Sequence, residues 1–224
     1  MLKFLDFDGV IVDSIKECYV VSKGIYFGYL AFLHDEDRYK ALFYKYRGLV
    51  RPAYEYMALH DAINIFIQSN NGNIRELFEL ALIKRSDKDK DFFEKEFFYK
   101  RHLYQNDDFL GWIAMNPLMP FGNQLRGTCD DNVYIVTTKN KESTMVLLDY
   151  YKIQVAGIYS NDDIKKFGNK GALIKSVMDE KNVKDAIFVD DAVEHLDTVQ
   201  DKRVLCFFAD WGYGENSNYN IYKF

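Results

Sequence analysis

Two aspartates stand two residues apart directly after a short apolar run near the start of the chain. The run covers residues 2–5, Asp6 and Asp8 follow it, and Gly9 comes next. Because side chains of a strand alternate between its two faces, residues i and i+2 point to the same side. We therefore expect Asp6 and Asp8 to project together from the carboxyl end of a buried strand, the edge at which open α/β sheets bind ligands.

A pair of carboxylates in this arrangement supports two kinds of chemistry. Oxygen donors suit a hard divalent cation such as Mg²⁺. The same groups can also divide labour, one attacking an electrophile while its neighbour carries a proton to or from the leaving group. The alternative is a solvated Asp-Gly turn after a strand, and residues elsewhere in the chain decide between these interpretations.

Composition excludes several classes of protein. With 224 residues, 48% of them hydrophobic, the chain is long enough for a full core, as one domain with a large insertion or as two domains. A net charge of -5 without a long basic run argues against a nucleic-acid partner. No secretory leader or bilayer-spanning run is visible, which predicts a cytoplasmic protein without a membrane partner. Three cysteines without paired spacing indicate neither disulfides nor a zinc site.

A helical block is expected in the first half of the chain. Ser14 and Glu17 have the Ser-x-x-Glu spacing of a capping box, so a helix should begin near Ser14. Residues 35–111 are charged and aromatic at helical spacing, with a turn at residues 69–73. The expected apolar faces of this block contain Leu77, Leu80, Ala81, Phe92, Phe93 and Phe97.

The second half of the chain alternates short β-branched runs with helical segments. The expected strands cover residues 133–136, 155–159, 186–189 and 204–208, and the expected helices cover residues 142–151, 171–181 and 193–200. This alternation predicts a Rossmann-like α/β fold with a parallel sheet covered on both faces. The run at residues 2–5 has no local partner and must join that sheet. We thus expect a discontinuous core domain, residues 1–14 and 120–224, with a helical cap domain, residues 15–119, inserted in it.

Three of the expected strands end in polar side chains suited to chemistry. Besides Asp6 and Asp8, these are Thr137 and Thr138 after the second strand and Asp190 and Asp191 after the fourth. The carboxyl ends of parallel strands share one edge, so these groups should meet in one crevice. Their summed negative charge favours a bound cation and a nearby lysine, for which Lys165, Lys166 and Lys170 are the candidates. Taken singly, the threonines read as turn residues, the aspartates as helix caps and the lysines as solvated side chains.

The chain resembles the haloacid dehalogenase superfamily of phosphohydrolases, in the branch that carries a helical cap after the first motif. Residues 4–14 are similar to the first motif of that family and residues 133–140 to the second. Residues 187–191 are similar to the double-Asp form of the fourth, and residues 211–214 to a segment of phosphoglycolate-phosphatase-like members. The resemblance covers residues 1–14 and about 120–214 and leaves the helical block unmatched.

The resemblance implies a role for each matched position. Asp6 would attack phosphorus and form an aspartyl-phosphate, and Asp8 would protonate the leaving oxygen and later activate water. Thr137, with Thr138, and Lys170 would bind the phosphoryl group. Mg²⁺ would be held by the Asp6 carboxylate, the Asp8 backbone carbonyl and Asp191, with help from Asp190.

Two motifs depart from the family pattern. The third motif of the family has proline after its lysine, whereas Lys170 precedes Gly171, so Lys166 is an alternative to Lys170. In the fourth motif Ala192 and His195 stand where many relatives carry polar or acidic residues, which leaves Asp190 and Asp191 as alternatives for the principal metal ligand. We expect His195 on the surface of a helix. Asp8 argues against dehalogenase chemistry, because the dehalogenating branch lacks an acid at that position.

Arg47 and Arg51 are the candidate substrate residues of the helical block. They flank a glycine break, and their guanidinium groups suit a second anionic or polyol group on the substrate. The alternative is that they pair with surface acids such as Asp35 or Glu36.

The sequence as a whole predicts a Mg²⁺-dependent phosphatase acting on a small phosphorylated metabolite, a sugar phosphate or a phosphoglycolate-like acid. A phosphomutase of the same family is the nearest alternative, because the aspartyl-phosphate can be returned to a substrate hydroxyl. A non-catalytic binding protein on the same fold is the alternative from another class, and the presence of both Asp6 and Asp8 speaks against it.

Overall fold

The computed structural model describes residues 1–28, 35–216 and 218–224. The chain forms two compact units: an α/β unit, Met1–Ser14 with Asn116–Phe224, and a helical unit, Ile15–Met115. Each unit contains its own hydrophobic core. The chain leaves the α/β unit after its first strand and returns to it after the last helix of the helical unit.

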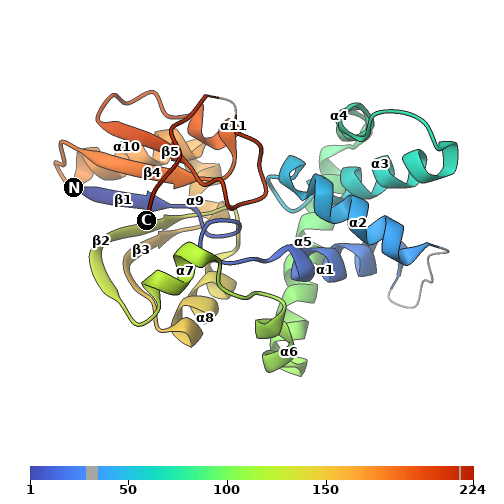
Figure 1. Cartoon of the computed structure of the whole chain (residues 1–224), viewed down its shortest axis with the longest axis horizontal. Helices are drawn as coiled ribbons and strands as arrows, with labels where there is room; N and C mark the ends of the chain where they lie inside the picture. Colours follow the sequence, from blue (N-terminus) through green and yellow to red (C-terminus); the bar gives the residue numbers. More distant parts are fainter. Residues whose placement is uncertain (29–34, 217) are drawn as a thin grey trace. The chain divides into compact units, whose positions relative to one another are not determined.

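The α/β unit is built on a sheet whose described strands are all parallel, in the order β3-β2-β1-β4-β5 (Figure 1). The strands are β1 (Leu2–Leu5), β2 (Cys129–Val136), β3 (Gln154–Tyr159), β4 (Ala186–Asp190) and β5 (Val204–Phe208). The predicted Rossmann-like parallel sheet is thus confirmed. The run at the chain start does join distant strands, as the central strand, because its apolar side chains need cover on both faces.

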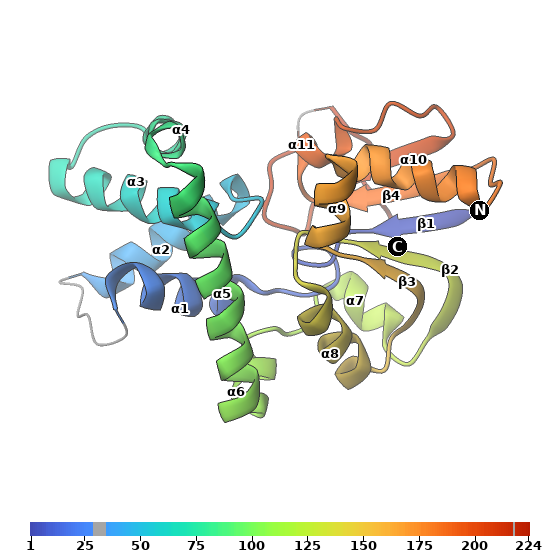
Figure 2. The ribbon, with the colours of Figure 1, turned by 180° about the vertical axis from the view of Figure 1, so that it is seen from behind.

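Helices cover both faces of this sheet. They are α7 (Pro120–Leu125), α8 (Lys141–Tyr151), α9 (Asn161–Phe167), α10 (Lys170–Glu180) and α11 (Val193–Leu196). The chain moves in one direction along the sheet from β2 to β3 and in the other from β3 to β4, so right-handed crossovers place α8 and α10 on opposite faces. Buried Leu173 and Val177 of α10 pack with Phe4 and Phe188 of the strands, on the face seen in Figure 2.

Strand register sets the edge that matters for function. Leu5, the last residue of β1, lies beside Ile135 of β2 and Val189 of β4. The residues that follow these strands therefore emerge at one level. This register brings the ends of three strands to the same edge although they are far apart in sequence.

The helical unit consists of helices alone among its described residues. They are α1 (Ile15–Phe27), α2 (Glu36–Tyr46), the 3₁₀ turn η1 (Arg47–Leu49), α3 (Glu55–Ser69), α4 (Ile74–Lys84), α5 (Asp87–Asp107) and α6 (Phe109–Ala114). The predicted turn at residues 69–73 lies between α3 and α4, where Asn70 takes a left-handed conformation with φ 48°. Small polar residues favour such a turn.

Three local expectations were wrong. Leu80 is 54% exposed and Phe92 is 63% exposed. Each of their helices buries a single face, and these two residues lie next to that face. Ala81, Phe93 and Phe97 lie on the buried faces. The helix expected over residues 193–200 ends at Leu196, and tight turns follow it.

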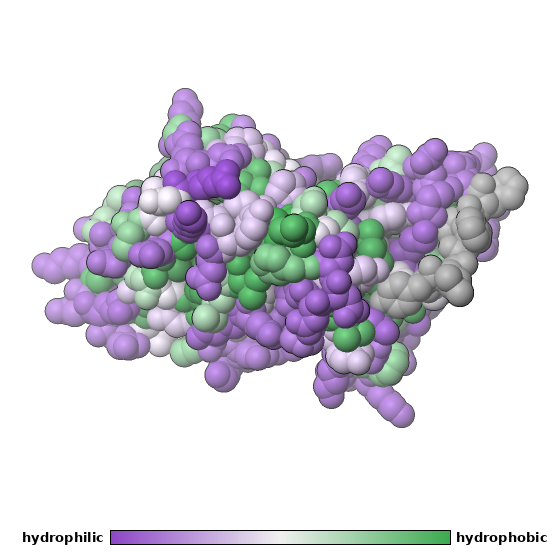
Figure 3. Space-filling view, turned by 90° about the horizontal axis from the view of Figure 1, so that it is seen from below, coloured by the Kyte–Doolittle hydropathy of each residue, from purple (hydrophilic) through white to green (hydrophobic). Residues whose placement is uncertain are grey.

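The face of the molecule seen in Figure 3 is mostly polar. Figure 3 shows mostly hydrophilic side chains with apolar groups between them, which agrees with a charged content of 28%. Among the described residues, every helix falls short of the length or the apolar character that spanning a bilayer requires.

Candidate active site

Asp6 and Asp8 occupy the loop that leaves the central strand. The Asp6 backbone N–H donates to Val189 O at 2.9 Å, which ties the first residue after β1 to the neighbouring strand β4. Asp6 is 6% exposed, and the side chain of Asp8 is 14% exposed. Gly9 follows with φ +85°, a conformation that favours glycine and turns the chain back at this point.

Lys170 lies between two carboxylates from different strands. Its Nζ is 2.9 Å from Asp6 Oδ1 and 2.8 Å from Asp190 Oδ2, and the lysine is 1% exposed. Lys170 is the first residue of α10, and the preceding Asn169 accepts the Ala172 N–H. Lys166, the alternative, has a 71% exposed side chain next to Asp163, and Lys165 is also exposed. The structure thus brings Lys170, and neither of the other two lysines, to the carboxylates.

Burial and charge act together on the pKa values of this group. Burial opposes ionisation of Asp190, but Lys170 and His195 outweigh it, so the pKa of Asp190 lies well below its usual value. Burial and the charge of Asp190 raise the pKa of Asp6, and Lys170 offsets only part of this effect. Burial also acts against the charge on Lys170, yet Asp190 and Asp6 together raise its pKa. Lys170 and Asp190 are therefore an ion pair that leaves Asp6 with incomplete charge compensation.

Thr137 directly follows β2, the strand that pairs with β1. It is 1% exposed, its backbone N–H donates to Tyr159 O at 2.9 Å, and its hydroxyl oxygen accepts the Lys139 N–H at 3.1 Å. A hydroxyl that accepts from an amide keeps its proton to donate. This geometry suits a donor to an anionic ligand. Thr138, the next residue, is partly exposed.

Lys139 is a functional-looking residue that the sequence analysis missed. Its ammonium lies 3.2 Å from Asp8 Oδ1 and 3.4 Å from Asp8 Oδ2, and its side chain has no exposed surface. The available signal was alternation: Thr137 and Lys139 stand two residues apart after a strand, as Asp6 and Asp8 do.

Asp191 is enclosed by two loops. Its Oδ2 accepts the Tyr213 backbone N–H at 2.6 Å, and a Cβ at Gly212 or Gly9 would lie within 2.3 Å or 2.4 Å of Asp191 atoms. Asp191 is therefore pressed against the backbone that follows Asp8. The glycines of the Trp211–Gly214 segment allow this close approach.

His195 is partly buried, and the expectation that it lies on a helix surface was wrong. Its Nδ1 lies 3.1 Å from Asp190 Oδ2, and its side chain is 15% exposed. His195 belongs to α11, which begins three residues after Asp190, and its ring is directed back toward the end of β4.

The donor set fits a divalent cation. Four carboxylates, those of Asp6, Asp8, Asp190 and Asp191, meet two buried ammonium groups at this edge, an excess of two negative charges when all are ionised. Ligand atoms of Asp6, Asp190 and His195 lie within 4.8 Å of one another. The Lys170 ammonium already bonds both acids of that trio.

Arg47 and Arg51 lie in the helical unit and bond to their own segment. Arg47 is 7% exposed, its Nη1 donates to Val50 O at 3.0 Å, and its guanidinium stacks on the Tyr56 ring. Arg51 Nη1 donates to Gly48 O at 2.5 Å and Val50 O at 3.2 Å. Of the acids named as alternative partners, Asp35 accepts the Arg38 backbone N–H and Glu36 contacts Lys23.

The fold of this chain is that of the haloacid dehalogenase-like hydrolases. It shares with them the parallel sheet and the inserted helical unit. A predicted phosphoglycolate phosphatase from Haemophilus somnus is 12% identical, with a TM-score of 0.61, over 96% of this chain and 88% of that chain. A Bacteroides fragilis protein assigned as a haloacid dehalogenase-like hydrolase is 14% identical, with a TM-score of 0.61, over 95% and 89%.

A haloacid dehalogenase-like family protein from Streptococcus pneumoniae is 16% identical to the chain, with a TM-score of 0.51, over 95% of this chain and 86% of that chain. No protein-family model and no curated protein matches the sequence. The likeness is therefore one of fold.

Proposed function

We propose that this chain is a phosphatase that hydrolyses a small phosphorylated metabolite by phosphoryl transfer through Asp6. The observation that carries the proposal is a pair of acids with a buried ammonium group beside each. The Asp6 carboxylate lies 2.9 Å from Lys170 Nζ, and Asp8, two residues further on, lies beside Lys139. A nucleophile, a proton carrier and cations for phosphoryl oxygens are the parts that phosphoryl transfer requires. The fold, shared with hydrolases and a predicted phosphatase, supports the same conclusion.

The proposed reaction has two steps. An Asp6 carboxylate oxygen attacks phosphorus, the bond from phosphorus to the leaving oxygen breaks, and Asp8 gives that oxygen a proton. Asp8 then takes a proton from water, the water oxygen attacks phosphorus, and the Asp6–phosphorus bond breaks to release phosphate. Lys170 and the Thr137 hydroxyl neutralise charge on the phosphoryl oxygens during both steps.

We assign Mg²⁺ to the carboxylates of Asp6 and Asp191, with the backbone of the Asp8 loop beside them. The support is the excess negative charge at this edge and the closeness of Asp191 to Gly9. When bound, the ion supplies positive charge to the transferring group. Asp190, bonded to Lys170 and to the Ala192 N–H, orients the lysine instead.

We assign choice of the leaving group to the helical unit, as a cap with Arg47 and Arg51 as its substrate residues. Two guanidinium groups in a segment broken at Gly48 suit an anionic or polyol group on the substrate. This assignment concerns specificity and leaves the transfer chemistry with the α/β unit.

The test is Mg²⁺-dependent phosphate release from p-nitrophenyl phosphate and then from a panel of phosphorylated metabolites. Asp6→Asn should reduce turnover below detection, and Asp8→Asn should lower kcat about 10²- to 10⁴-fold. Asp149→Asn, an exposed aspartate on α8, is the matched control and should keep wild-type rates.

Circular dichroism should show that all three variants remain folded. Wild-type protein that releases no phosphate from any substrate, or an active Asp6→Asn, would contradict the proposal. Conversion of a sugar phosphate to its isomer without phosphate release would identify a phosphomutase.

A further inference from the structure

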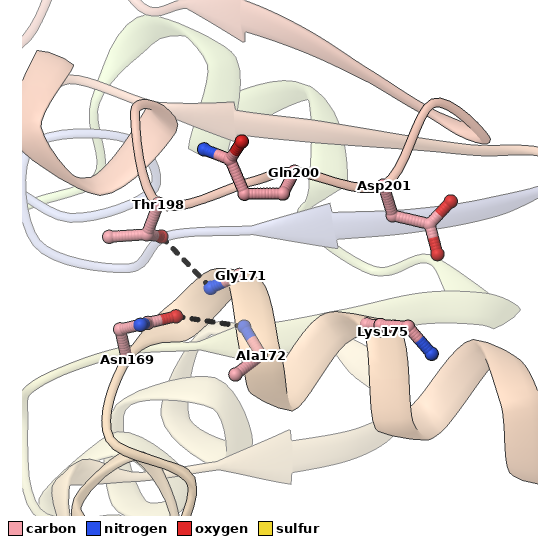
Figure 4. Close-up of a pocket in the computed structure, with 7 residues that line it drawn as sticks. All are labelled: Asn169, Gly171, Ala172, Lys175, Thr198, Gln200 and Asp201. Carbon is pink, nitrogen blue, oxygen red and sulfur yellow. Dashed lines mark hydrogen bonds between the residues drawn. The ribbon is translucent and has the colours of Figure 1, made fainter.

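Thr198 connects the start of α10 with the segment that follows α11. Its Oγ1 accepts the Gly171 N–H at 2.9 Å (Figure 4). The same hydroxyl donates to His195 O at 2.6 Å. Gly171 is the residue next to Lys170, and its approach to Thr198 is close, since a Cβ there would lie 2.1 Å from Thr198 O. This contact explains why glycine, and no bulkier residue, follows the lysine.

These bonds belong to a closed ring that contains the two charged groups beside Asp6. From Thr198 the ring runs to His195 O, and the His195 ring lies 3.1 Å from Asp190 Oδ2. Asp190 Oδ2 accepts from Lys170 Nζ at 2.8 Å, and the backbone of Lys170 leads to Gly171, which closes the ring at Thr198. Both the main chain and the side chain of Lys170 are therefore fixed from the same short segment.

The ring has a mechanical consequence for the lysine. A lysine side chain has four rotatable bonds, so the position of its ammonium depends on its backbone and on its acceptors. Thr198 holds the amide of Gly171, the second residue of the helix, and, through His195, the orientation of one acceptor. Displacement of a positioned group by about 1 Å can cost about a hundredfold in rate.

We propose that Thr198 is a positioning residue that acts through Lys170 and Asp190 on the Asp6 phosphoryl-transfer site. The predicted effect on kcat rests on the proposed function. The predicted effect on the position of Lys170 rests on the geometry alone. The proposal predicts an effect on kcat and none on KM, because the influence of Thr198 reaches the transferring phosphoryl group only through Lys170.

The chain offers a matched control in the same helix turn. Asn169 accepts from Ala172 N at 2.8 Å, so it also bonds one amide at the start of α10, but it is outside the ring (Figure 4). Thr198→Val removes the hydroxyl at nearly constant volume, beside a pocket of about 300 Å³ that can accommodate the extra methyl. Thr198→Ser restores the hydroxyl, and Asn169→Ala removes one cap.

The experiment compares kcat and KM of these variants with an aryl phosphate. We expect Thr198→Val to lower kcat about tenfold at unchanged KM, Thr198→Ser to return it to within about twofold, and Asn169→Ala to stay within about twofold of wild type. An equal loss in Thr198→Val and Asn169→Ala, an unchanged kcat in Thr198→Val, or a failure of serine to restore it would overturn the proposal.

A second measurement separates this proposal from the proposed function. The Hε–Cε resonance of Lys170, assigned by its loss in Lys170→Met, should shift in Thr198→Val and stay in place in Asn169→Ala. This readout needs no turnover, so it tests the ring even if wild-type protein hydrolyses no substrate. An unshifted resonance in Thr198→Val would overturn the coupling of Thr198 to Lys170.

Discussion

The Lys139 ammonium lies 3.2 Å from Asp8 Oδ1 and 3.4 Å from Asp8 Oδ2, so both oxygens of the proposed acid–base group face one buried cation. The pair connects residues that follow two neighbouring parallel strands, β1 and β2. Charge-assisted bonds of this kind are stronger and more directional than neutral ones. Lys139 thus fixes the carboxylate that has to reach the leaving oxygen.

Loss of that cation should impair chemistry more than folding. Lys139→Met keeps the aliphatic stem and removes the charge, so we expect kcat to fall about 10- to 100-fold at a nearly unchanged KM. Lys141→Met, an exposed lysine on α8, is the control and should retain the wild-type rate. Steady-state kinetics with an aryl phosphate measure the effect, and equal rates in the two variants would remove Lys139 from the site.

The metal ligand should be Asp191 in preference to Asp190. We expect Asp191→Asn to raise the Mg²⁺ concentration for half-maximal activity at least about tenfold, because it removes an oxygen ligand charge. Asp190→Asn should mainly lower kcat, because Asp190 bonds Lys170. Mg²⁺ titrations of both variants, followed by activity and by calorimetry, measure the two effects. If Asp190→Asn weakened Mg²⁺ binding and Asp191→Asn mainly lowered kcat, the two assignments would be exchanged.

A buried ion pair should dominate the stability of the helical unit. Arg101 Nε lies 2.5 Å from Glu17 Oε1, Trp112 Nε1 donates to the same oxygen at 2.8 Å, and all three residues are at most 2% exposed. Arg101→Met leaves the Glu17 charge buried and should cost about 3–5 kcal/mol of unfolding free energy. Urea unfolding followed by Trp112 fluorescence measures it.

The control for that variant is Lys166→Met, which breaks an exposed ion pair with Asp163 and should change stability by less than about 1 kcal/mol. Glu17→Gln combined with Arg101→Met removes both charges and should recover part of the loss. A double variant no more stable than Arg101→Met would argue against an uncompensated charge as the cause.

Acid should destabilise the helical unit through His60. His60 is fully buried, its Nε2 lies 2.9 Å from Ser22 Oγ and its Nδ1 2.7 Å from Tyr39 OH. Burial, together with the Lys23 charge, lowers the pKa of His60 from 6.5 to about 3. The unfolded chain then binds a proton below about pH 6.5 that the folded chain does not, so stability is complete above that pH and falls toward pH 3.

Between pH 6.5 and pH 5 the expected loss is about 2 kcal/mol. His60→Gln should abolish this dependence, whereas His102→Gln, an exposed histidine of α5, should retain it. Denaturant titrations at pH 7.5, 6.5 and 5 measure the slope. The same slope in wild type and His60→Gln would exclude His60 as its source.

The arginines of the helical unit should affect substrate binding. We expect Arg51→Ala to raise KM about tenfold for substrates with a second anionic group and to leave KM for an aryl phosphate unchanged. The Arg47 guanidinium stacks on the Tyr56 ring, so Arg47→Ala also removes packing. The KM of this variant is therefore compared only after circular dichroism shows that it is folded. Unchanged KM values across the phosphorylated substrates in both variants would end their assignment.

Strand positions were predictable because each depends on a local pattern. The runs at residues 155–159, 186–189 and 204–208 match β3, β4 and β5 to within one residue at either end. The exposed side chains of Leu80 and Phe92 were not predictable, because an apolar residue at the edge of a helix face is buried only if a neighbouring element covers it. The helix expected over residues 193–200 stops early at Leu196, because the Thr198 and Val199 amides bond carbonyls three residues back in tight turns.

By itself the sequence determined the parallel α/β fold, the inserted helices and the strand ends that carry Asp6, Asp8, Thr137 and Asp190, because strand alternation and helix periodicity are local properties of the chain. Tertiary structure alone decided which charges meet: Lys170 between Asp6 and Asp190, Lys139 on Asp8, and His195 on Asp190. The sequence does not distinguish a lysine that is solvated from one that is buried against a carboxylate. The partner of a lysine is set by strand register and by where a helix begins, and both arise only when distant segments pack.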